Sequence, residues 1–196
     1  MTETALRHRT LEELAAFLPE LLAASPRDVG SLELLVRRTA PGEREVLVEG
    51  VLDLDDGLVG DGWRARGSSR TADGSAHPDM QLNIMNARLV EFLAGDPDRR
   101  ALAGDQLFLD LDLSHENLPV GTRLVIGDPA ARGAVVEVTE VPHTGCAKFV
   151  ERFGAEAMRF VNGEVGRPLR LRGLNARVVV AGTVRPGDPV LVQRPA

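Results

Sequence analysis

The feature that most constrains this chain is a succession of short apolar or alternating segments separated by turns rich in Gly, Pro, Asp and Asn. About eight of these segments are expected to be strands: residues 31–39, 45–54, 80–85, 107–113, 123–126, 134–141, 175–182 and 189–192. No strand–helix–strand repetition and no glycine-rich phosphate loop accompanies them. The pattern predicts a mainly β protein built on a closed or nearly closed antiparallel β-barrel with peripheral α-helices.

The N-terminal region has the pattern of an amphipathic helix. Thr10 and Glu13 form a capping box before an apolar stripe of helical period, and Pro19 is expected to kink the helix or to begin a second one. We therefore divide the chain into a helical appendage, residues 1–30, and a barrel domain, residues 31–196. The appendage is expected to pack against the barrel or against a second subunit, which leaves a homodimer open.

Two further helices are expected beside the barrel. Residues 87–93 have a helical pattern that Asn86 can cap. Residues 149–162 have helical spacing that is interrupted at Gly154, and their aromatic side chains are expected in the core.

Composition argues against two classes of partner. The net charge of −6 argues against a nucleic acid bound through its phosphates, which requires clustered Lys and Arg. No apolar run approaches the roughly 20 residues that span a bilayer, and the first residues lack the apolar region of a signal peptide. We therefore expect a cytoplasmic protein with no membrane partner.

The sequence gives little indication of a metal site formed by the chain alone. A single cysteine excludes an intramolecular disulfide, and no CxxC or HExxH pattern indicates zinc. Asp110 and Asp112 alternate with apolar residues in the segment 107–113. This alternation favours the wet face of a half-buried strand over a cation-binding pair.

Residues 141–149, VPHTGCAKF, contain the only cysteine of the chain, Cys146, and its only lysine, Lys148. Cationic neighbours lower the pKa of a thiol from about 8.5 toward neutrality, and Lys148 and His143 are the candidates for that effect. Gly145 allows a tight turn between an expected strand and an expected helix. The three side chains are therefore predicted to be catalytic, and the open alternative is a cysteine that serves only as a small buried hydrophobe.

Two groups of polar side chains are candidates for binding an anion. The irregular segment 57–79 carries residues that can close over a ligand by charge-assisted hydrogen bonds, namely Asp61, Arg64, Arg66, Arg70 and His77. A mobile, solvated loop is the alternative for this segment. Arg167, Arg170 and Arg172 alternate near the end of the chain and indicate either a pocket wall or a solvated edge strand.

The order of several motifs resembles that of the MOSC domain, the C-terminal module of molybdenum-cofactor sulfurases, which also occurs as stand-alone bacterial proteins. The matching motifs are the Glu116-Asn117-Leu118 triplet, Gly121, Leu124-Val125-Ile126-Gly127, an apolar strand, and Cys146 followed two positions later by a basic residue. Upstream, GLVGD and MQLNIMN resemble the family's early glycine-aspartate turn and the strand after it. The resemblance covers roughly residues 32–192.

This resemblance implies a β-barrel in which Cys146 either accepts sulfur as a persulfide or ligates the molybdenum of a pterin cofactor, molybdopterin. Stand-alone members are thought to reduce N-hydroxylated compounds, so a small-molecule substrate and an electron-donor protein are implied partners. At the level of the family, pyridoxal phosphate binding is also associated. The implied cofactor-binding residues, besides those of the loop, are Ser114, His115, Asn117 and Arg167, and the loop arginines would hold the cofactor phosphate.

Three positions depart from the family pattern. Gly145 stands where a proline commonly precedes the cysteine, Gly62 and Trp63 follow Asp61 where a histidine is common, and Glu116 stands where an arginine often precedes the asparagine. These departures keep an alternative open, in which the chain is a non-catalytic barrel that binds a small anionic ligand or a protein partner.

Overall fold

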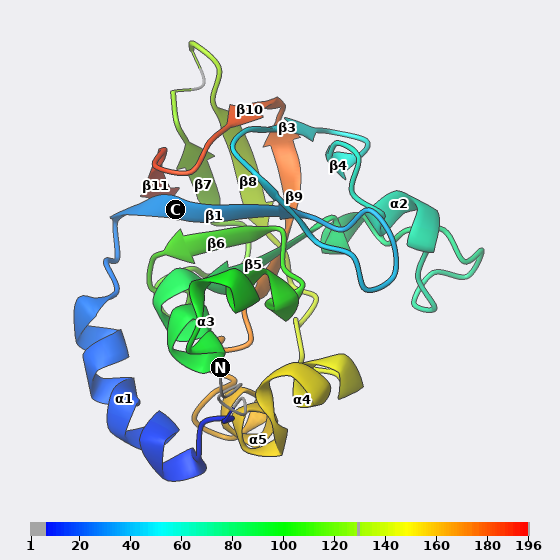
Figure 1. Cartoon of the computed structure of the whole chain (residues 1–196). Helices are drawn as coiled ribbons and strands as arrows, with labels where there is room; N and C mark the ends of the chain where they lie inside the picture. Colours follow the sequence, from blue (N-terminus) through cyan, green and yellow to red (C-terminus); the bar gives the residue numbers. More distant parts are fainter. Residues whose placement is uncertain (1–6, 129, 196) are drawn as a thin grey trace.

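The structure is a computed structural model that describes residues 7–128 and 130–195. Within them seven strands close into a barrel in the spatial order β1, β6, β5, β9, β8, β7 and β11, and β11 pairs back with β1 (Figure 1). Their bounds are Val29–Arg37 (β1), Leu82–Asn86 (β5), Leu107–Asp110 (β6), Arg123–Ile126 (β7), Ala134–Val138 (β8), Leu174–Val180 (β9) and Pro189–Gln193 (β11). The predicted closed β-barrel with peripheral helices is confirmed.

The barrel is mixed rather than antiparallel throughout. Strands β5 and β6 run parallel, with Ile84 opposite Leu107, whereas the other described neighbours in the barrel are antiparallel. A parallel pair needs a crossover connection. Here α3 (Ala87–Ala94) and the 3-10 helix η2 (Pro97–Ala103) supply it.

A small second sheet flanks the barrel, and it corrects one prediction. The expected single strand 45–54 is two strands: β2 (Glu45–Leu47) pairs with β1, and β3 (Gly50–Asp53) pairs with β4 (Gly57–Leu58) and β10 (Gly182–Val184). A Cβ at Gly50 would lie 2.7 Å from Leu35 Cδ2. The glycine therefore lets the chain cross directly over the core where it changes sheets.

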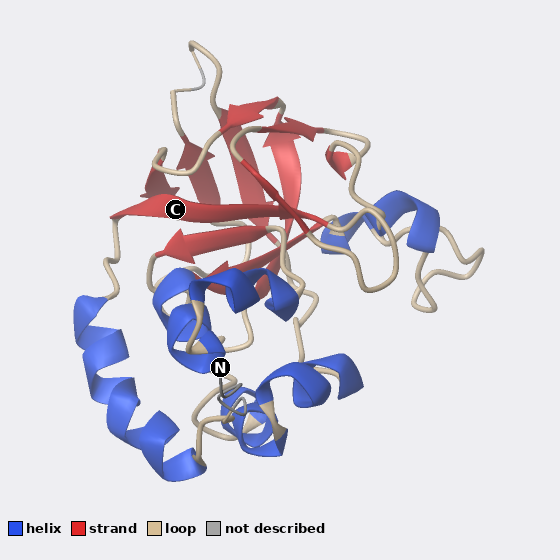
Figure 2. Ribbon diagram, in the orientation of Figure 1, coloured by secondary structure: helices blue, strands red, loops and turns tan. Residues whose placement is uncertain are grey.

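Two hydrophobic cores hold the elements together. One fills the barrel, and the other lies between the barrel and four helices, α1 (Leu11–Ala24), α3, α4 (Ala147–Phe153) and α5 (Ala155–Asn162) (Figure 2). Strand β6 contributes to both, because Leu107 and Leu109 face the first core and Phe108 faces the second. The helices therefore cover the second face of β6 at Phe108, whereas Asp110 and Asp112 are partly exposed.

Local sequence signals place the helix ends well. In α1 (Leu11–Ala24) both hydrogen bonds of the Thr10 capping box are present, and the helix continues through Pro19. Asn86 caps α3 by accepting from the amide of Leu89. The break expected at Gly154 separates α4 (Ala147–Phe153) from α5 (Ala155–Asn162).

The expected appendage and barrel domain extend to residues 1–6 and 196, which lie outside the described residues. Leu14 and Leu21 of α1 are buried in the second core.

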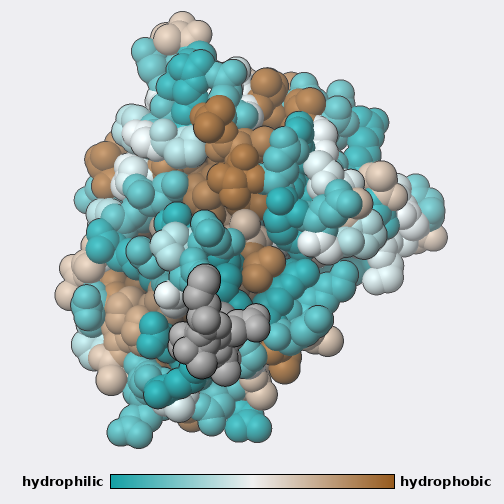
Figure 3. Space-filling view, viewed as in Figure 1, coloured by the Kyte–Doolittle hydropathy of each residue, from teal (hydrophilic) through white to brown (hydrophobic). Residues whose placement is uncertain are grey.

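Among the described residues, no helix is long and apolar enough to cross a bilayer. Figure 3 shows hydrophobic surface gathered over the upper part of the barrel, and Val46, Val48 and Val51 are exposed on β2, β3 and the connection between them.

Candidate functional site

Cys146 lies at the N-terminal end of α4, directly after the turn that follows β8. Its backbone carbonyl accepts from the amides of Phe149 and Val150, so the residue begins the helix, and its thiol is exposed. The amide of Gly145 donates to Asn162 Oδ1 at 3.0 Å, and a Cβ at Gly145 would lie 2.4 Å from Met158 Sδ. The glycine therefore allows α5 to pack closely beneath the turn that presents the thiol.

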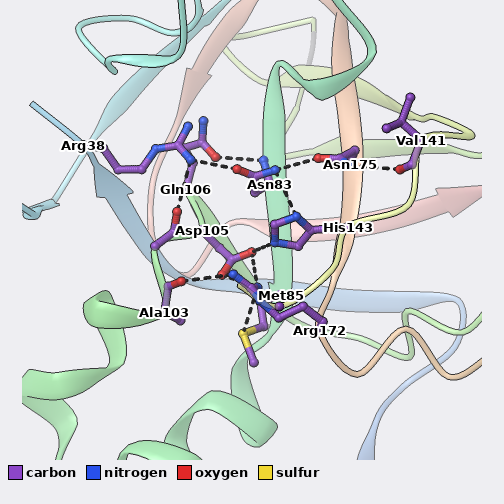
Figure 4. A network of polar contacts seen from close by, with 12 residues as sticks. Arg38, Asn83, Met85, Ala103, Asp105, Gln106, Val141, His143, Arg172 and Asn175 are labelled. Carbon is purple, nitrogen blue, oxygen red and sulfur yellow. Dashed lines mark hydrogen bonds and ion pairs between the residues drawn. The ribbon is translucent and has the colours of Figure 1, made fainter. Parts of the chain in front are cut away.

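A buried polar network lies between β5, β9, the 103–106 segment and the 139–143 segment (Figure 4). Asn83 stands at its centre. Its Oδ1 accepts from Arg38 Nη1 at 2.7 Å, and its Nδ2 donates to Asn175 Oδ1 at 2.6 Å and faces His143 Nδ1 at 3.4 Å. Asn175 Nδ2 in turn donates to the carbonyl oxygen of Val141. The network thereby fixes the segment that leads to Cys146.

The ion pairs of this network fix the protonation of His143. Asp105 is fully buried, and it accepts from Arg172 Nη1 at 2.8 Å and meets His143 Nε2 at 2.9 Å. Burial opposes ionisation of Asp105, but the charge of Arg172 and the hydrogen bonds from His143 and Arg172 hold its pKa below the usual value. Burial, and then the charge of Arg172, lower the pKa of His143 against the pull of Asp105. At neutral pH His143 is therefore neutral, with the proton on Nε2 donated to Asp105 and Nδ1 free to accept from Asn83.

Asp61 and Arg38 form the second buried ion pair of the site. Arg38 Nη2 and Nε donate to the two carboxylate oxygens of Asp61 at 2.7 and 2.9 Å, and both side chains are buried. The amides of Arg38 and Trp63 also donate to this carboxylate. Burial opposes ionisation of Asp61, but the bonds and charge of Arg38 lower its pKa overall.

Beside this pair lies a cavity of about 330 Å³, which we call the basic cavity. Its lining residues are Arg38, Thr39, Ala40, Pro41, Gly42, Arg44, Gly62, Ala65, Arg66 and Lys148. Desolvation and the neighbouring charges of Arg152 and Arg38 lower the pKa of Arg44. The Nε atom of Arg44 is buried without a hydrogen-bond partner. The basic cavity thus brings together four cationic side chains whose charge the carboxylate of Asp61 balances only in part.

A second cavity, of about 380 Å³, is lined in part by the segment that precedes Cys146; we call it the His143 cavity. Its lining residues are His115, Thr139, Glu140, Val141, Pro142, His143, Thr144, Val161, Asn162, Gly166, Arg167, Arg170, Arg172, Gly173 and Leu174. Along the chain, Cys146 therefore stands between Thr144, which lines the His143 cavity, and Lys148, which lines the basic cavity.

The structure brings together only part of the predicted loop site. Arg66 lines the basic cavity, and Asp61 reaches it through Arg38. Arg64 instead pairs with Asp56 at 2.6 Å, and His77 Nδ1 accepts from the amide of Asp79 as the cap of the 3-10 helix η1 (Pro78–Met80). Arg70 is exposed in the same loop and lines neither cavity.

The residues of the central motif lie apart from the basic cavity. Asn117 is fully buried, and its side chain donates to the carbonyl oxygens of Arg27 and Asp112, as a turn-stabilising asparagine does. The hydroxyl of Ser114 accepts from the amide of Asn117. His115 and Arg167 line the His143 cavity.

The segment 167–172, for which an edge strand was one alternative, is a series of turns in which Arg170 and Arg172 are buried. The solvated edge-strand reading of these arginines is therefore wrong.

The network also contains residues that the sequence patterns did not single out, notably Asn83, Asp105, Gln106 and Asn175. Each is buried, and each lies in or next to a segment that is otherwise apolar. That is the signal that identifies them, because a polar side chain in a strand with two buried faces must have a specific partner.

Comparisons with known proteins support the fold. The YUAD protein of Bacillus subtilis superposes with a TM-score of 0.55 at 18% identity, over 84% of this chain and 95% of that chain. YiiM of Escherichia coli superposes with a TM-score of 0.52 at 18% identity, over 85% and 71% respectively. These likenesses support a MOSC-like barrel fold. A scan against protein-family models finds no match, and a search of curated proteins finds none.

Proposed function

We propose that this protein binds a molybdenum cofactor of the molybdopterin type, with Cys146 as the protein ligand of the metal and the basic cavity as the seat of the cofactor's anionic group. The observation that carries the proposal is the position of the exposed thiol, two residues before Lys148, which lines a cavity with three arginines. The proposed activity is the reduction of small N-hydroxylated compounds, with electrons from a partner protein.

The electrostatics of the basic cavity support an anionic ligand. Arg38 repels the positive charges of Arg44 and Arg66. This repulsion adds to desolvation in lowering the pKa of Arg44 and the pKa of Arg66. Arg44 also has a buried Nε atom without a hydrogen-bond partner. Such an arrangement costs stability when the cavity is empty and is compensated when an anion accepts those N–H groups. A phosphate group fits because its several oxygens can accept from more than one guanidinium.

The residues present also fit the metal. A cysteine thiolate is a soft ligand that suits a thiophilic metal ion, and Cys146 has an exposed sulfur with no role in capping its helix. When bound, the cofactor would supply two-electron redox chemistry. The chain would hold its anionic group with Arg44, Arg66 and Lys148. His143 would be neutral and held in place by Asp105. It would therefore help to fix the segment that leads to Cys146, and it would not supply positive charge to the thiol.

Sulfur transfer is a second candidate, since it uses the same exposed thiol. The thiolate of Cys146 would attack the outer sulfur of a donor persulfide, form a new S–S bond and release the donor as its thiol. This reaction requires no metal. The two candidates therefore differ in the molybdenum content of the purified protein.

The test is purification from a host that makes molybdopterin, followed by elemental analysis for molybdenum. We expect metal in the wild-type protein, a loss of most of it in Cys146→Ser, and a decrease in Arg66→Gln. Arg64→Gln is the matched control, because Arg64 lies in the same loop but pairs with Asp56. Equal metal content in wild type and Cys146→Ser would rule out the cysteine as ligand, and a metal-free wild-type protein would leave sulfur transfer or plain anion binding.

A further inference from the structure

The His143 cavity contains a buried cation that the proposed function does not use. Arg170 is 8% exposed, and within residues 7–128 and 130–195 it forms no ion pair with a carboxylate. Its Nη1 atom donates to the carbonyl oxygen of Leu118 at 2.6 Å. Burial lowers its pKa to about 10. A buried guanidinium is normally paired, because desolvation of an unpaired charge is expensive.

The backbone holds this arginine in an uncommon conformation. Arg170 has φ +47°, and among the described residues it is the one non-glycine residue with a positive φ. Its amide donates to the carbonyl oxygen of Arg167, and its own carbonyl accepts from Gly173, so the turn is well fixed. A strained residue that persists in a fixed turn is often a feature of a binding site.

The rest of the lining adds positive charge and apolar surface. Arg167 is exposed at the cavity, and Arg172, already paired with Asp105, has a buried Nε atom without a partner. Desolvation and the charge of Arg170 lower the pKa of His115. Glu140 is the acidic residue of the lining, and it is exposed.

We propose that the His143 cavity binds a small organic anion in which a carboxylate is joined to an apolar body, with Arg170 and Arg167 as its carboxylate-binding residues. An apolar body is indicated because Val141, Pro142 and Leu174 line a volume of about 380 Å³, larger than an inorganic anion needs. The carboxylate would supply the counter-charge that Arg170 lacks, and bidentate arginine–carboxylate pairing favours that group. The proposal goes beyond the molybdenum cofactor and does not depend on it.

The test uses benzoate as the probe and benzamide as its neutral counterpart, with calorimetry for affinity and amide chemical shifts for position. We expect benzoate to bind about tenfold or more tightly than benzamide and to shift the resonances of Val161, Gly173 and Leu174. Arg170→Gln should weaken benzoate by about tenfold. Arg167→Gln should weaken it less, because this side chain is more exposed.

Two controls keep the result decisive. Arg66 lines the basic cavity, so Arg66→Gln should leave the affinity for benzoate unchanged. The variant is expected to lower the molybdenum content alone, which separates failure of the molybdenum proposal from failure of the benzoate proposal. Arg167→Gln serves if Arg170→Gln does not fold, because the exposed Arg167 side chain makes no side-chain hydrogen bond within the described residues. Equal affinity for benzoate and benzamide would overturn the proposal, and so would amide chemical-shift changes confined to the basic cavity. Tighter binding of phenyl phosphate than of benzoate would overturn the choice of a carboxylate.

Discussion

The ion pair between Asp61 and Arg38 gives the sharpest prediction about stability. Replacing Asp61 by Asn keeps the shape of the side chain but removes its charge. The guanidinium of Arg38 then stays buried without its counter-ion, although it keeps a hydrogen bond to Asn83. The amides of Arg38 and Trp63, which now donate to carboxylate oxygens, would partly face an NH₂ group instead.

The expected loss follows from the burial of both partners. Removing one member of a buried, hydrogen-bonded ion pair costs about 3–5 kcal/mol, because the remaining charge is left uncompensated. For a chain of 196 residues this corresponds to a decrease in Tm of roughly 6 to 20 °C. The lowered pKa of Asp61 gives the sign of a pH effect. Its contribution is present above the unfolded pKa of about 3.9 and is lost as pH falls through the folded value.

Urea unfolding at pH 7 measures this loss, and Asp110→Asn is the matched control. Asp110 also pairs with an arginine, Arg88, but the Arg88 side chain is 42% exposed, and exposed pairs contribute about 1 kcal/mol or less. We expect Asp61→Asn to lower the free energy of unfolding by at least about 2 kcal/mol more than Asp110→Asn. Equal losses in the two variants would refute the role of the buried pair.

Three further perturbations have defined outcomes. The lowered pKa of His143 means that the free energy of unfolding decreases as pH falls below about 6.5. His143→Gln should therefore make the free energy of unfolding depend less on pH between 4 and 7. An unchanged pH dependence, measured by urea unfolding, would contradict this. Gly145→Ala should cost about 1–3 kcal/mol through its clash with Met158, and Met158→Ala should relieve part of that cost in a double-mutant cycle. Phe108→Ala should cost about 3–5 kcal/mol, whereas Val48→Ala, at a site that is 88% exposed, should change the unfolding free energy by less than about 0.5 kcal/mol.

Sequence patterns predicted best those features that depend on neighbouring residues. The Thr10 capping box, the Asn86 cap and the break at Gly154 are each determined within one or two turns of chain, and all three are present. The barrel followed from the number and spacing of the short strands. The parallel pairing of β5 and β6 did not, because strand direction depends on where the intervening helices pack.

The features that sequence patterns missed depend on tertiary contacts. Phe108 has the position of an outward-facing residue in its strand, and only the helices packed over β6 make it a core residue. The arginines near residue 170 alternate as in a strand, yet the turn at Arg170 and Gly173 and the pairing with Asp105 give a different structure. Asp105 could be linked to His143 only through the fold, since 38 residues separate them.

The turn-to-helix position expected for Cys146 is present in the structure, whereas the surroundings of this residue differ from the expectation. Cys146 is the N-cap of α4, and Lys148 lies in the first turn of that helix, directly after the turn expected at Gly145. His143 is close in sequence, but its side chain points into the buried network (Figure 4). The cations of the basic cavity come from the β1–β2 connection as well as from the loop, and Arg44 had no distinguishing sequence context.

The most direct test of the central claim measures the reactivity of the single thiol with and without cofactor. The chain has one cysteine, so iodoacetamide adds one label, and mass spectrometry counts it without ambiguity. We expect rapid alkylation of Cys146 in cofactor-free protein and strong protection in protein purified with bound molybdenum, with loss of the metal from any chain that becomes alkylated. Equal alkylation rates in the two preparations, or alkylated chains that retain their molybdenum, would show that the cofactor does not bind through Cys146.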